Sequence, residues 1–266
     1  MAPSYDRLSV RLLQIRERPA VIAEEQASFL ARTGLRPDQL LVTDVLSEPL
    51  PATLLDGIDA VMIGGAGAYS VVDTFAWTDD LVALCQGCAD RALPLFGSCW
   101  GHQFIARAFG GSVVNDSSRA EMGTCDVWQT PAGRRDALFS TLPDRFGVQM
   151  GHHDRVAQLP EGAVELATNA TAPYQAFRLG DLPIYGTQFH TELDAETERG
   201  RLMTYRAHYP EMADDAVFQA TLDSLHPTPD ADDLLRRFLV RYAVADGAAR
   251  LAADLATRRP AAALAS

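Results

Sequence analysis

The feature that most constrains the fold is a segment in which an apolar strand pattern passes abruptly into an apolar helix pattern. Leu93–Phe96 is an apolar run, and an apolar helix pattern follows it and ends at Gly110-Gly111. Between them stands the sequence GSCWG, residues 97–101. A chain that turns this sharply takes strained backbone angles, and a glycine on either side gives it room. The segment therefore predicts a strand–turn–helix unit with Cys99 at the turn.

The first hundred residues alternate between strand and helix patterns. Helical spacing covers Ala20–Thr33, where Gly34 supplies a stop, and a second helix is expected over Trp77–Arg91. Alternation of this kind argues for a parallel sheet with helices on both faces. The strands expected before Leu93 are Ser9–Gln14, Leu40–Val45 and Asp59–Ile63.

A different pattern begins at Ser112. Short alternating stretches up to Glu192 predict antiparallel or mixed strands joined by turns, and helices return after Ala195 with a strongly amphipathic stretch at Asp232–Val244. The Ala-rich tail, Gly247–Ala265, is either a final helix or a frayed end. The alternating stretches are Thr124–Thr130, Arg145–Met150, Gln175–Leu179 and Ile184–Phe189.

The charge of the chain limits the partners that it can be expected to bind. The 266 residues carry a formal net charge of −12 and are 47% hydrophobic, which is enough for a substantial core. An acidic surface repels nucleic-acid phosphates and anionic lipid headgroups, so we expect neither nucleic acid nor a membrane as a partner. No apolar run reaches the roughly 18 residues that span a bilayer, and residues 1–13 lack the apolar stretch of a secretory signal. A cytoplasmic location is the expectation.

The four cysteines do not form a disulfide framework, because they are too few for a chain of this length. Cys85 and Cys88 form a CxxC pair, but no second ligand pair or thioredoxin-like setting accompanies it. Two small apolar side chains on the buried face of one helix are the favoured interpretation. No metal and no cofactor are expected.

Cys99 has the surroundings that a reactive thiol needs. It would stand at a helix N-terminus, where unpaired amides and the helix dipole favour a thiolate. The backbone N–H group of Trp100 would point at the same space and form one half of an oxyanion hole. The motif by itself is also compatible with a structural cysteine, so the downstream partners matter.

Those partners are His190 and Glu192. A strand is expected to end at His190, and Glu192 lies two residues later, so both side chains can leave the same side of an extended segment. The carboxylate can accept a hydrogen bond from one imidazole nitrogen, and the other nitrogen is then free to face Cys99. This is the nucleophile–base–orienter arrangement of a thiol hydrolase.

Three separately placed motifs carry a family resemblance. The run FGSCWGHQ, residues 96–103, continuing to AFGG at 108–111, resembles the nucleophile motif of class I (triad-type) glutamine amidotransferases. IGGAG at 63–67 resembles their oxyanion-strand motif, and QFHTE at 188–192 resembles their His-x-Glu motif. The likeness covers roughly Leu8 to Leu193. The subgroup it most resembles is the stand-alone, GMP-synthase-like amidotransferases, which are also similar to plant γ-glutamyl peptidases.

The resemblance implies a fold and a set of roles. The fold is α/β, a flavodoxin-like and mostly parallel sheet flanked by helices, with a smaller antiparallel portion. Residues 1–194 would form the amidotransferase-like domain, and 195–266 a helical extension packed on it. The implied roles are Cys99 as nucleophile, His190 as base and then acid, Glu192 as orienter, Gly65 and Trp100 as oxyanion donors, and Gln103 with the segment 150–154, which includes His152, His153 and Asp154, as substrate-binding residues.

Some features of the chain depart from the family or leave alternatives open. Thr191 stands where many members have proline, and the segment 150–154 is also compatible with a turn in a surface loop. No P-loop is present and there is no room for a fused ATP-binding domain, so the sequence does not identify the acceptor of any ammonia. One hypothesis is a glutaminase subunit that passes ammonia to a separate synthetase subunit. The alternatives are a stand-alone γ-glutamyl peptidase or hydrolase and a non-catalytic partner domain. The motifs argue against the last but do not separate a glutaminase from a peptidase; the expected ligand is glutamine or another γ-glutamyl small molecule.

Overall fold

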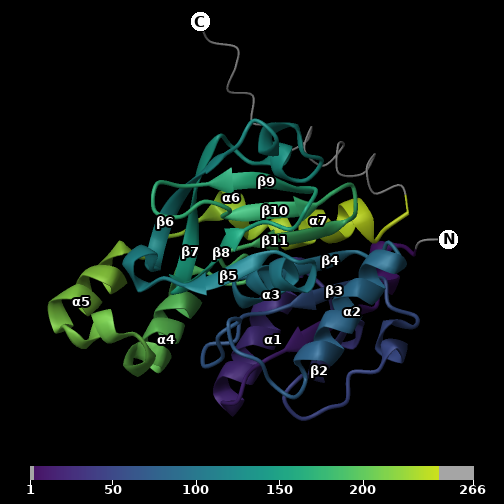
Figure 1. The fold of residues 1–266 in the computed structure, drawn as a ribbon, viewed down its shortest axis with the longest axis horizontal. Coiled ribbons are helices and arrows are strands. Elements are labelled where there is room, and N and C mark those ends of the chain that lie inside the picture. Colours follow the sequence, from purple (N-terminus) through teal and green to yellow (C-terminus); the bar gives the residue numbers. More distant parts are fainter. Residues whose placement is uncertain (1–2, 246–266) are drawn as a thin grey trace, which may run out of the picture.

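A large twisted sheet forms the centre of the molecule (Figure 1). The computed structural model describes residues 3–245, and within them nine strands pair in the order β2-β1-β3-β4-β11-β10-β9-β6-β7. The first five of these strands are parallel, and the remaining pairings are antiparallel. The parallel part has the 2-1-3-4-5 arrangement of flavodoxin-like folds. The predicted α/β fold class is confirmed.

The bounds of the elements are as follows. The strands are β1 (Val10–Gln14), β2 (Leu40–Asp44), β3 (Ala60–Ile63), β4 (Leu95–Ser98), β5 (Ser112–Asn115), β6 (Glu121–Gln129), β7 (Arg145–His152), β8 (Asp154–Gln158), β9 (Ala163–Thr168), β10 (Ala176–Leu179) and β11 (Ile184–Thr187). The helices are α1 (Pro19–Thr33), α2 (Thr78–Asp90), α3 (Trp100–Ala108), α4 (Ala195–Tyr205), α5 (Asp215–Ser224), α6 (Pro229–Asp232) and α7 (Leu234–Tyr242).

Helices cover both faces of the parallel strands, and each face has its own apolar core. On one face, α1 and α7 contribute Phe29 and Phe238, which belong to the same core as Phe96 of β4. On the other face, α2 and α3 pack over Val61 and Ile63 of β3. Successive strand residues point to opposite faces, so the all-apolar β3 supplies both cores, as a buried parallel strand should.

The cysteine pair of α2 belongs to the second core. Cys85 and Cys88 are each 1% exposed and lie among the apolar side chains of that core. Burial among such neighbours raises the pKa of Cys88 to about 12, so this thiol remains protonated at neutral pH. These observations agree with the interpretation of the pair as small core residues.

The structure also corrects several expected element boundaries. Three strands were not expected from the sequence, namely β5, β8 and β9, and β5 pairs with β8 in a separate two-stranded sheet. The strand expected over Ile184–Phe189 ends at Thr187. The helix expected over Asp232–Val244 is interrupted at Asp233, so that α6 and α7 are distinct. The Ala-rich tail lies outside the described residues.

The chain after β11 folds back over the sheet instead of extending away from it. Asp194 caps α4 by accepting hydrogen bonds from the N–H groups of Glu196 and Thr197. The helix packs against α1 and against β6 and β7, and η7 (Arg206–His208) and η8 (Pro210–Ala213) follow it. The division into a domain at 1–194 and an extension at 195–266 stays a prediction, but the extension contacts the same sheet.

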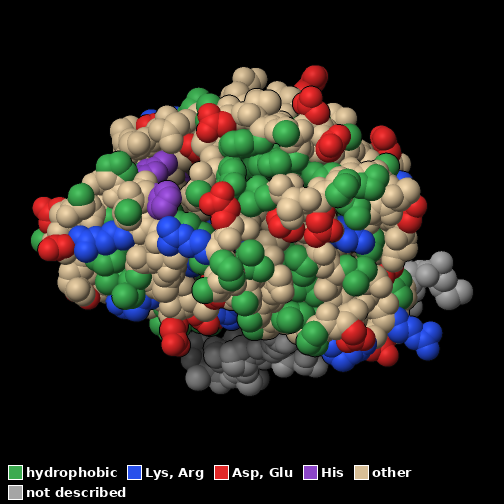
Figure 2. Space-filling view, turned by 90° about the horizontal axis from the view of Figure 1, so that it is seen from below, with side chains coloured by type: hydrophobic (Ala, Val, Ile, Leu, Met, Phe, Trp, Pro, Cys, Tyr) green, Lys and Arg blue, Asp and Glu red, His purple; other side chains and the backbone are tan. Residues whose placement is uncertain are grey.

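The outer surface carries its charges in a dispersed way. On the face drawn in Figure 2, acidic side chains are scattered among small groups of apolar side chains and a few basic ones. Among residues 3–245, no helix is both long enough and apolar enough to cross a membrane.

Candidate active site

Cys99 occupies the turn between β4 and α3. Its backbone angles are φ 50° and ψ −100°, in a region that residues with a side chain rarely adopt. Strained angles of this kind cost about 1–3 kcal/mol and persist where the surrounding structure enforces them. The expected strand–turn–helix unit is therefore present, with the thiol at its sharpest point.

Two glycines make this turn possible by close backbone packing. A Cβ atom added to Gly97 would overlap the carbonyl group of Gly101. A Cβ atom added to Gly101 would overlap the carbonyl oxygen of Ile63, at the end of β3. The glycines thus let α3 start directly against the neighbouring strand, which fixes the direction in which Cys99 leaves the sheet.

His190 and Glu192 form a buried pair beside this turn. The Nδ1 atom of His190 lies 2.6 Å from Oε1 of Glu192, and the carboxylate is 1% exposed. The second oxygen, Oε2, accepts a hydrogen bond of 2.5 Å from the hydroxyl group of Ser98. Since Nδ1 is engaged by the carboxylate, Nε2 is the nitrogen left to face the thiol.

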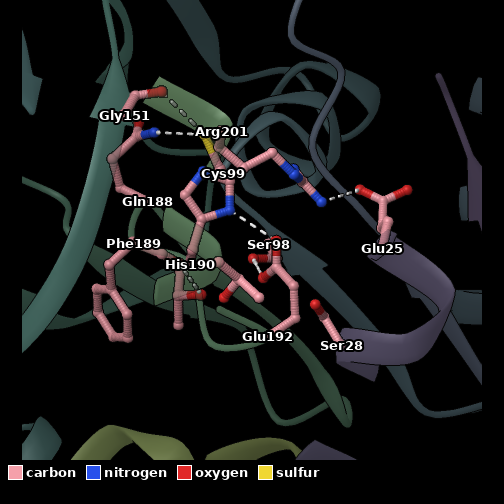
Figure 3. A network of polar contacts seen from close by, with 12 residues as sticks. Glu25, Ser28, Ser98, Cys99, Gly151, Gln188, Phe189, His190, Glu192 and Arg201 are labelled. Atoms are coloured by element: carbon pink, nitrogen blue, oxygen red, sulfur yellow. Dashed lines mark hydrogen bonds and ion pairs between the residues drawn. The ribbon is translucent and has the colours of Figure 1, made fainter. Parts of the chain in front are cut away.

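The sulfur atom lies at the other end of this line of side chains (Figure 3). Cys99 is among the groups that raise the pKa of His190, so the thiol and the imidazole are neighbours. The Sγ atom also lies 3.8 Å from Nε2 of Gln188 and 3.9 Å from the carbonyl oxygen of Gly151. Cys99 is 7% exposed. Sulfur, imidazole and carboxylate are therefore connected, although the cysteine is some 90 residues from the other two.

The electrostatics of the pair favour a charged imidazolium beside a charged carboxylate. Burial opposes ionisation of Glu192, but His190, Arg201 and the Ser98 hydroxyl outweigh it and lower the pKa of this carboxyl to about 2. Burial likewise opposes charge on His190, yet the negative charges of Glu192 and Cys99 and hydrogen bonds to both hold its pKa well above its usual range. A proton on this imidazole is thus available for donation to a leaving group.

A cavity of about 230 Å³ opens over the thiol. Its walls come from the carboxyl ends of parallel strands β1, β3 and β4 and from the segment after β11, which is where ligands bind in open α/β sheets. A further wall comes from residues 151–154 at the junction of β7 and β8, and another from α4 with the residues that follow it. The residues that line the cavity include Arg16, Gly65, Cys99, Trp100, Gln103, Gly151, His190, Glu198, Arg201, Tyr205 and Tyr209.

The two expected oxyanion donors both reach this cavity. Trp100 is the first residue of α3, so its backbone N–H group is not used inside the helix. Gly65 follows β3, and a Cβ atom there would lie 2.6 Å from the Nη2 atom of Arg16 and 3.2 Å from Cε1 of His190. The arrangement leaves the Gly65 backbone close to the triad, with a buried guanidinium behind it.

The expected substrate-binding residues all line the cavity, but two of them are engaged in protein contacts. The Asp154 carboxylate accepts hydrogen bonds from Ser70 Oγ (2.5 Å) and Asn115 Nδ2 (2.8 Å). His152 Nε2 lies 3.3 Å from Oε2 of Glu121. These side chains therefore hold the wall of the cavity together.

The rest of this segment is also well defined. Gln103 donates a hydrogen bond of 2.6 Å to the carbonyl oxygen of Asp154, which joins α3 to β8. The His153 ring packs edge-on against Tyr209 at 5.1 Å between ring centres. Residues 150–152 end β7 and Asp154 begins β8, with a bend at His153 between the two strands.

Several residues of the site carried no recognisable signal in the sequence. Ser98 belongs to the cysteine motif, but nothing marked its hydroxyl as a partner of Glu192. Arg16 and Arg201 share the carboxylate of Glu25, at 2.9 Å and 3.8 Å respectively. These contacts join the end of β1, α1 and α4, and a contact between segments so far apart in sequence cannot be read from local patterns.

A cysteine at a strained strand–helix turn of an α/β sheet, beside a histidine–glutamate pair, is the arrangement that thiol hydrolases use. The sequence model of the family described as "Glutamine amidotransferase class-I" matches residues 33–207. The chain therefore belongs to the class I glutamine amidotransferase family.

Its relatives include subunits of GMP synthase. The chain is 32% identical over 159 residues to a glutamine-hydrolysing GMP synthase subunit of Thermoplasma acidophilum, a match that covers 60% of this chain and 75% of the relative. The corresponding GMP synthase subunit of Pyrococcus abyssi is 39% identical over 108 residues, which are 41% of this chain and 55% of the relative. The chain thus spans little more than half of the Pyrococcus protein.

Solved structures share the fold. A glutamine amidotransferase from Thermotoga maritima superposes with a TM-score of 0.66 at 20% identity, covering 89% of this chain and 98% of that one. A putative GMP synthase subunit from Thermoplasma acidophilum gives a TM-score of 0.58 at 24% identity, covering 76% of this chain and 96% of that one.

Proposed function

We propose that the protein hydrolyses the γ-amide of glutamine through a γ-glutamyl thioester on Cys99. The observation that carries this proposal is the connected line from Ser98 through Glu192 and His190 to the thiol, ending at a cavity. The cavity volume of about 230 Å³ is below the roughly 300–1,000 Å³ of pockets for drug-sized ligands, which suits a small amide.

The reaction would proceed in two halves. The thiolate attacks the γ-carbonyl carbon, and the N–H groups of Gly65 and Trp100 hold the negative oxygen, a contribution of about 3–4 kcal/mol per donor in related sites. His190 gives its proton to the departing ammonia as the carbon–nitrogen bond breaks. Water then gives a proton back to His190 and attacks the thioester, which releases glutamate and restores the thiol.

A partner that consumes ammonia would complete the function. The relatives from Thermoplasma and Pyrococcus are named as one subunit of a glutamine-hydrolysing synthase. By this likeness we infer that ammonia from this chain passes to a separate synthetase subunit. The alternative is a γ-glutamyl peptidase or hydrolase that acts alone, and it shares all of the chemistry above.

The test is to incubate the purified protein with glutamine and with a panel of γ-glutamyl amides and dipeptides, and to measure glutamate, ammonia and amine. Glutamate release that Cys99→Ala abolishes is the expected result. Release from glutamine that requires an added synthetase would favour the role of a synthase component, and release from dipeptides alone would favour the peptidase. Equal turnover by wild type and Cys99→Ala would overturn the proposal.

A further inference from the structure

Glu198 is a carboxyl group in the cavity wall that the proposed reaction does not use. It lies in α4, is 2% exposed, and lines the same cavity as Cys99 and His190. Among the hydrogen bonds within residues 3–245, none reaches its carboxyl oxygens, and these oxygens are not among the enclosed polar atoms that lack a partner, so they face the cavity. A carboxylate at this place can accept hydrogen bonds from N–H or O–H groups of a ligand.

The position of this carboxyl group relative to the thiol is defined by Gly151. The carbonyl oxygen of Gly151 lies 3.9 Å from Sγ of Cys99. A Cβ atom on Gly151 would lie 3.2 Å from Oε1 of Glu198 and 4.0 Å from Nε2 of His190. Glu198 Oε1 and His190 Nε2 therefore both lie next to Gly151, whose carbonyl oxygen is near the thiol. In the proposed reaction Nε2 is the nitrogen that gives its proton to the leaving group, so Glu198 lies near that group.

The charge of this group is balanced by its neighbours. Burial raises the pKa of Glu198 to about 7, while the positive charges of His190 and Arg201 lower it and the carboxylates of Glu192 and Glu24 raise it. Near neutral pH the group is therefore present in both protonation states. It can accept hydrogen bonds from a cation, and it can also take up a proton from one.

The ligand must present N–H donors on this side of the thiol. An ionised carboxylate only accepts hydrogen bonds, and the reacting group that lies beside His190 is the nitrogen of the scissile amide. After the carbon–nitrogen bond breaks, this nitrogen belongs to free ammonia or to a primary amine. Glu198 is placed to hold that molecule as its ammonium ion.

We propose that Glu198 forms the amine subsite of this enzyme, which binds the departing ammonia or primary amine and also admits a primary amine to the γ-glutamyl thioester. The inference rests on the proposed thioester chemistry. It adds an activity, γ-glutamyl transfer to amines, because a site that releases an amine along one path also accepts it along the reverse path.

The transfer step converts the γ-glutamyl thioester and a primary ammonium ion into a γ-glutamyl amide. A primary ammonium ion gives one proton to Glu198, and the free amine attacks the thioester carbon. The new carbon–nitrogen bond forms as the carbon–sulfur bond breaks, Cys99 leaves as the thiolate, and His190 takes the second proton of the nitrogen. The product is a γ-glutamyl amide. The proton on His190 replaces the one that it gave to ammonia, which restores the starting state, and the proton on Glu198 returns to solvent.

Two nucleophiles of different charge test this assignment. Methylamine is a cation at neutral pH and needs Glu198, whereas hydroxylamine is neutral there and attacks a thioester directly. The protein is incubated with glutamine and either nucleophile, and γ-glutamyl methylamide or γ-glutamyl hydroxamate is measured against glutamate. Wild type should form both, and Glu198→Gln should lower the ratio of methylamide to glutamate about tenfold or more while the hydroxamate ratio stays within about twofold.

Glu196→Gln is the matched control, because Glu196 is an exposed glutamate two residues away in the same helix. It should leave both ratios unchanged. An unchanged methylamide ratio in Glu198→Gln, or a wild type that forms hydroxamate but no methylamide, overturns the amine subsite. A wild type that forms no hydroxamate at all contradicts the thioester itself, so the two failures are distinct.

A rival role for Glu198 is to bind the α-ammonium group of the γ-glutamyl moiety. In that case Glu198→Gln would raise KM for glutamine but not for its analogue that lacks the α-amino group, 5-amino-5-oxopentanoate, and the methylamide ratio would not change. This combination would replace the proposal. Hydroxamate formation by Glu198→Gln serves as the evidence that the variant is folded.

Discussion

The hydroxyl group of Ser98 lies 2.5 Å from Oε2 of Glu192, the carboxylate oxygen that His190 does not use. Ser98 immediately precedes Cys99, so the strand that leads to the cysteine also holds the carboxylate that is bonded to His190. Both ends of the triad are thereby tied to β4. A shift of this strand would move the sulfur and the carboxylate together.

Replacement of Ser98 by alanine should weaken catalysis without unfolding the protein. The Ser98 hydroxyl helps to lower the pKa of Glu192, so its removal raises that pKa and leaves a buried oxygen without its donor. Such a loss costs about 1–3 kcal/mol. We expect kcat/KM for glutamine to fall about tenfold and the acid limb of its pH profile to move to higher pH. The exposed Ser140 provides the control Ser140→Ala, and equal profiles for the two variants would contradict the coupling.

Alanine variants are usually more stable than glycine variants at the same position, and the strained backbone at Cys99 should reverse this order of stability. Alanine keeps the Cβ atom that makes φ 50° unfavourable, whereas glycine relieves it. We expect Cys99→Gly to be more stable than Cys99→Ala by about 1 kcal/mol in denaturant unfolding, although both are inactive. At Cys85, inside α2, alanine should instead be the more stable by about 1 kcal/mol. The same order at both positions would show that the turn is not strained.

The close contact at Gly101 should make it intolerant of any side chain. A Cβ atom there would overlap the Ile63 carbonyl oxygen, and backbone atoms cannot move aside cheaply. Gly101→Ala should lower the free energy of unfolding by about 1–3 kcal/mol and abolish turnover by shifting Cys99. Gly200, in α4, has no atom within 4 Å of an added Cβ atom. Gly200→Ala should stabilise the protein by about 0.5–1 kcal/mol, and a comparable loss in both variants would count against the packing argument.

The pKa of Glu192 predicts a specific pH dependence of stability. Because this pKa is lowered from 4.5 to about 2 in the folded protein, ionisation of Glu192 stabilises the fold above pH 4.5. The contribution is lost as the pH falls from 4.5 toward 2 and amounts to roughly 3 kcal/mol. The difference in free energy of unfolding between wild type and Glu192→Gln should therefore shrink over that range, whereas the difference for the exposed Glu196→Gln should stay nearly constant. A flat difference for Glu192→Gln would contradict the lowered pKa.

The parallel half of the fold could be predicted from the sequence because its rules are local. Apolar runs such as Asp59–Ile63 are buried on both faces, and glycines such as Gly34, at φ 71°, end helices where the left-handed conformation is needed. The turn at Cys99 could be predicted for the same reason, because Gly97 and Gly101 flank it at positions that have no room for a side chain. These features depend on neighbours in the chain and on the period of the pattern.

The parts that escaped prediction depend on contacts between distant segments. β5 pairs only with β8, in a sheet of their own, and β9 lies between β10 and β6 in the large sheet. The burial of these strands depends on which partners they pair with, and alternation within each segment does not specify that. Glu198 and Arg201 look in the sequence like ordinary charged residues of a polar helix, and they become part of the site only because α4 packs against α1. Their roles depend on where the helix packs, which no local pattern specifies.

The cavity is built from two kinds of element, and this affects how related proteins with the same fold can differ. The sulfur, the imidazole and the amide donors are all fixed at the ends of sheet strands, whereas α4 and the short helices after it supply a single replaceable side of the chamber. Replacement of α4 and the short helices after it would change which molecules can enter the cavity and whether an amine is released or accepted there. The residues at the strand ends, Cys99 and His190 among them, would stay the same.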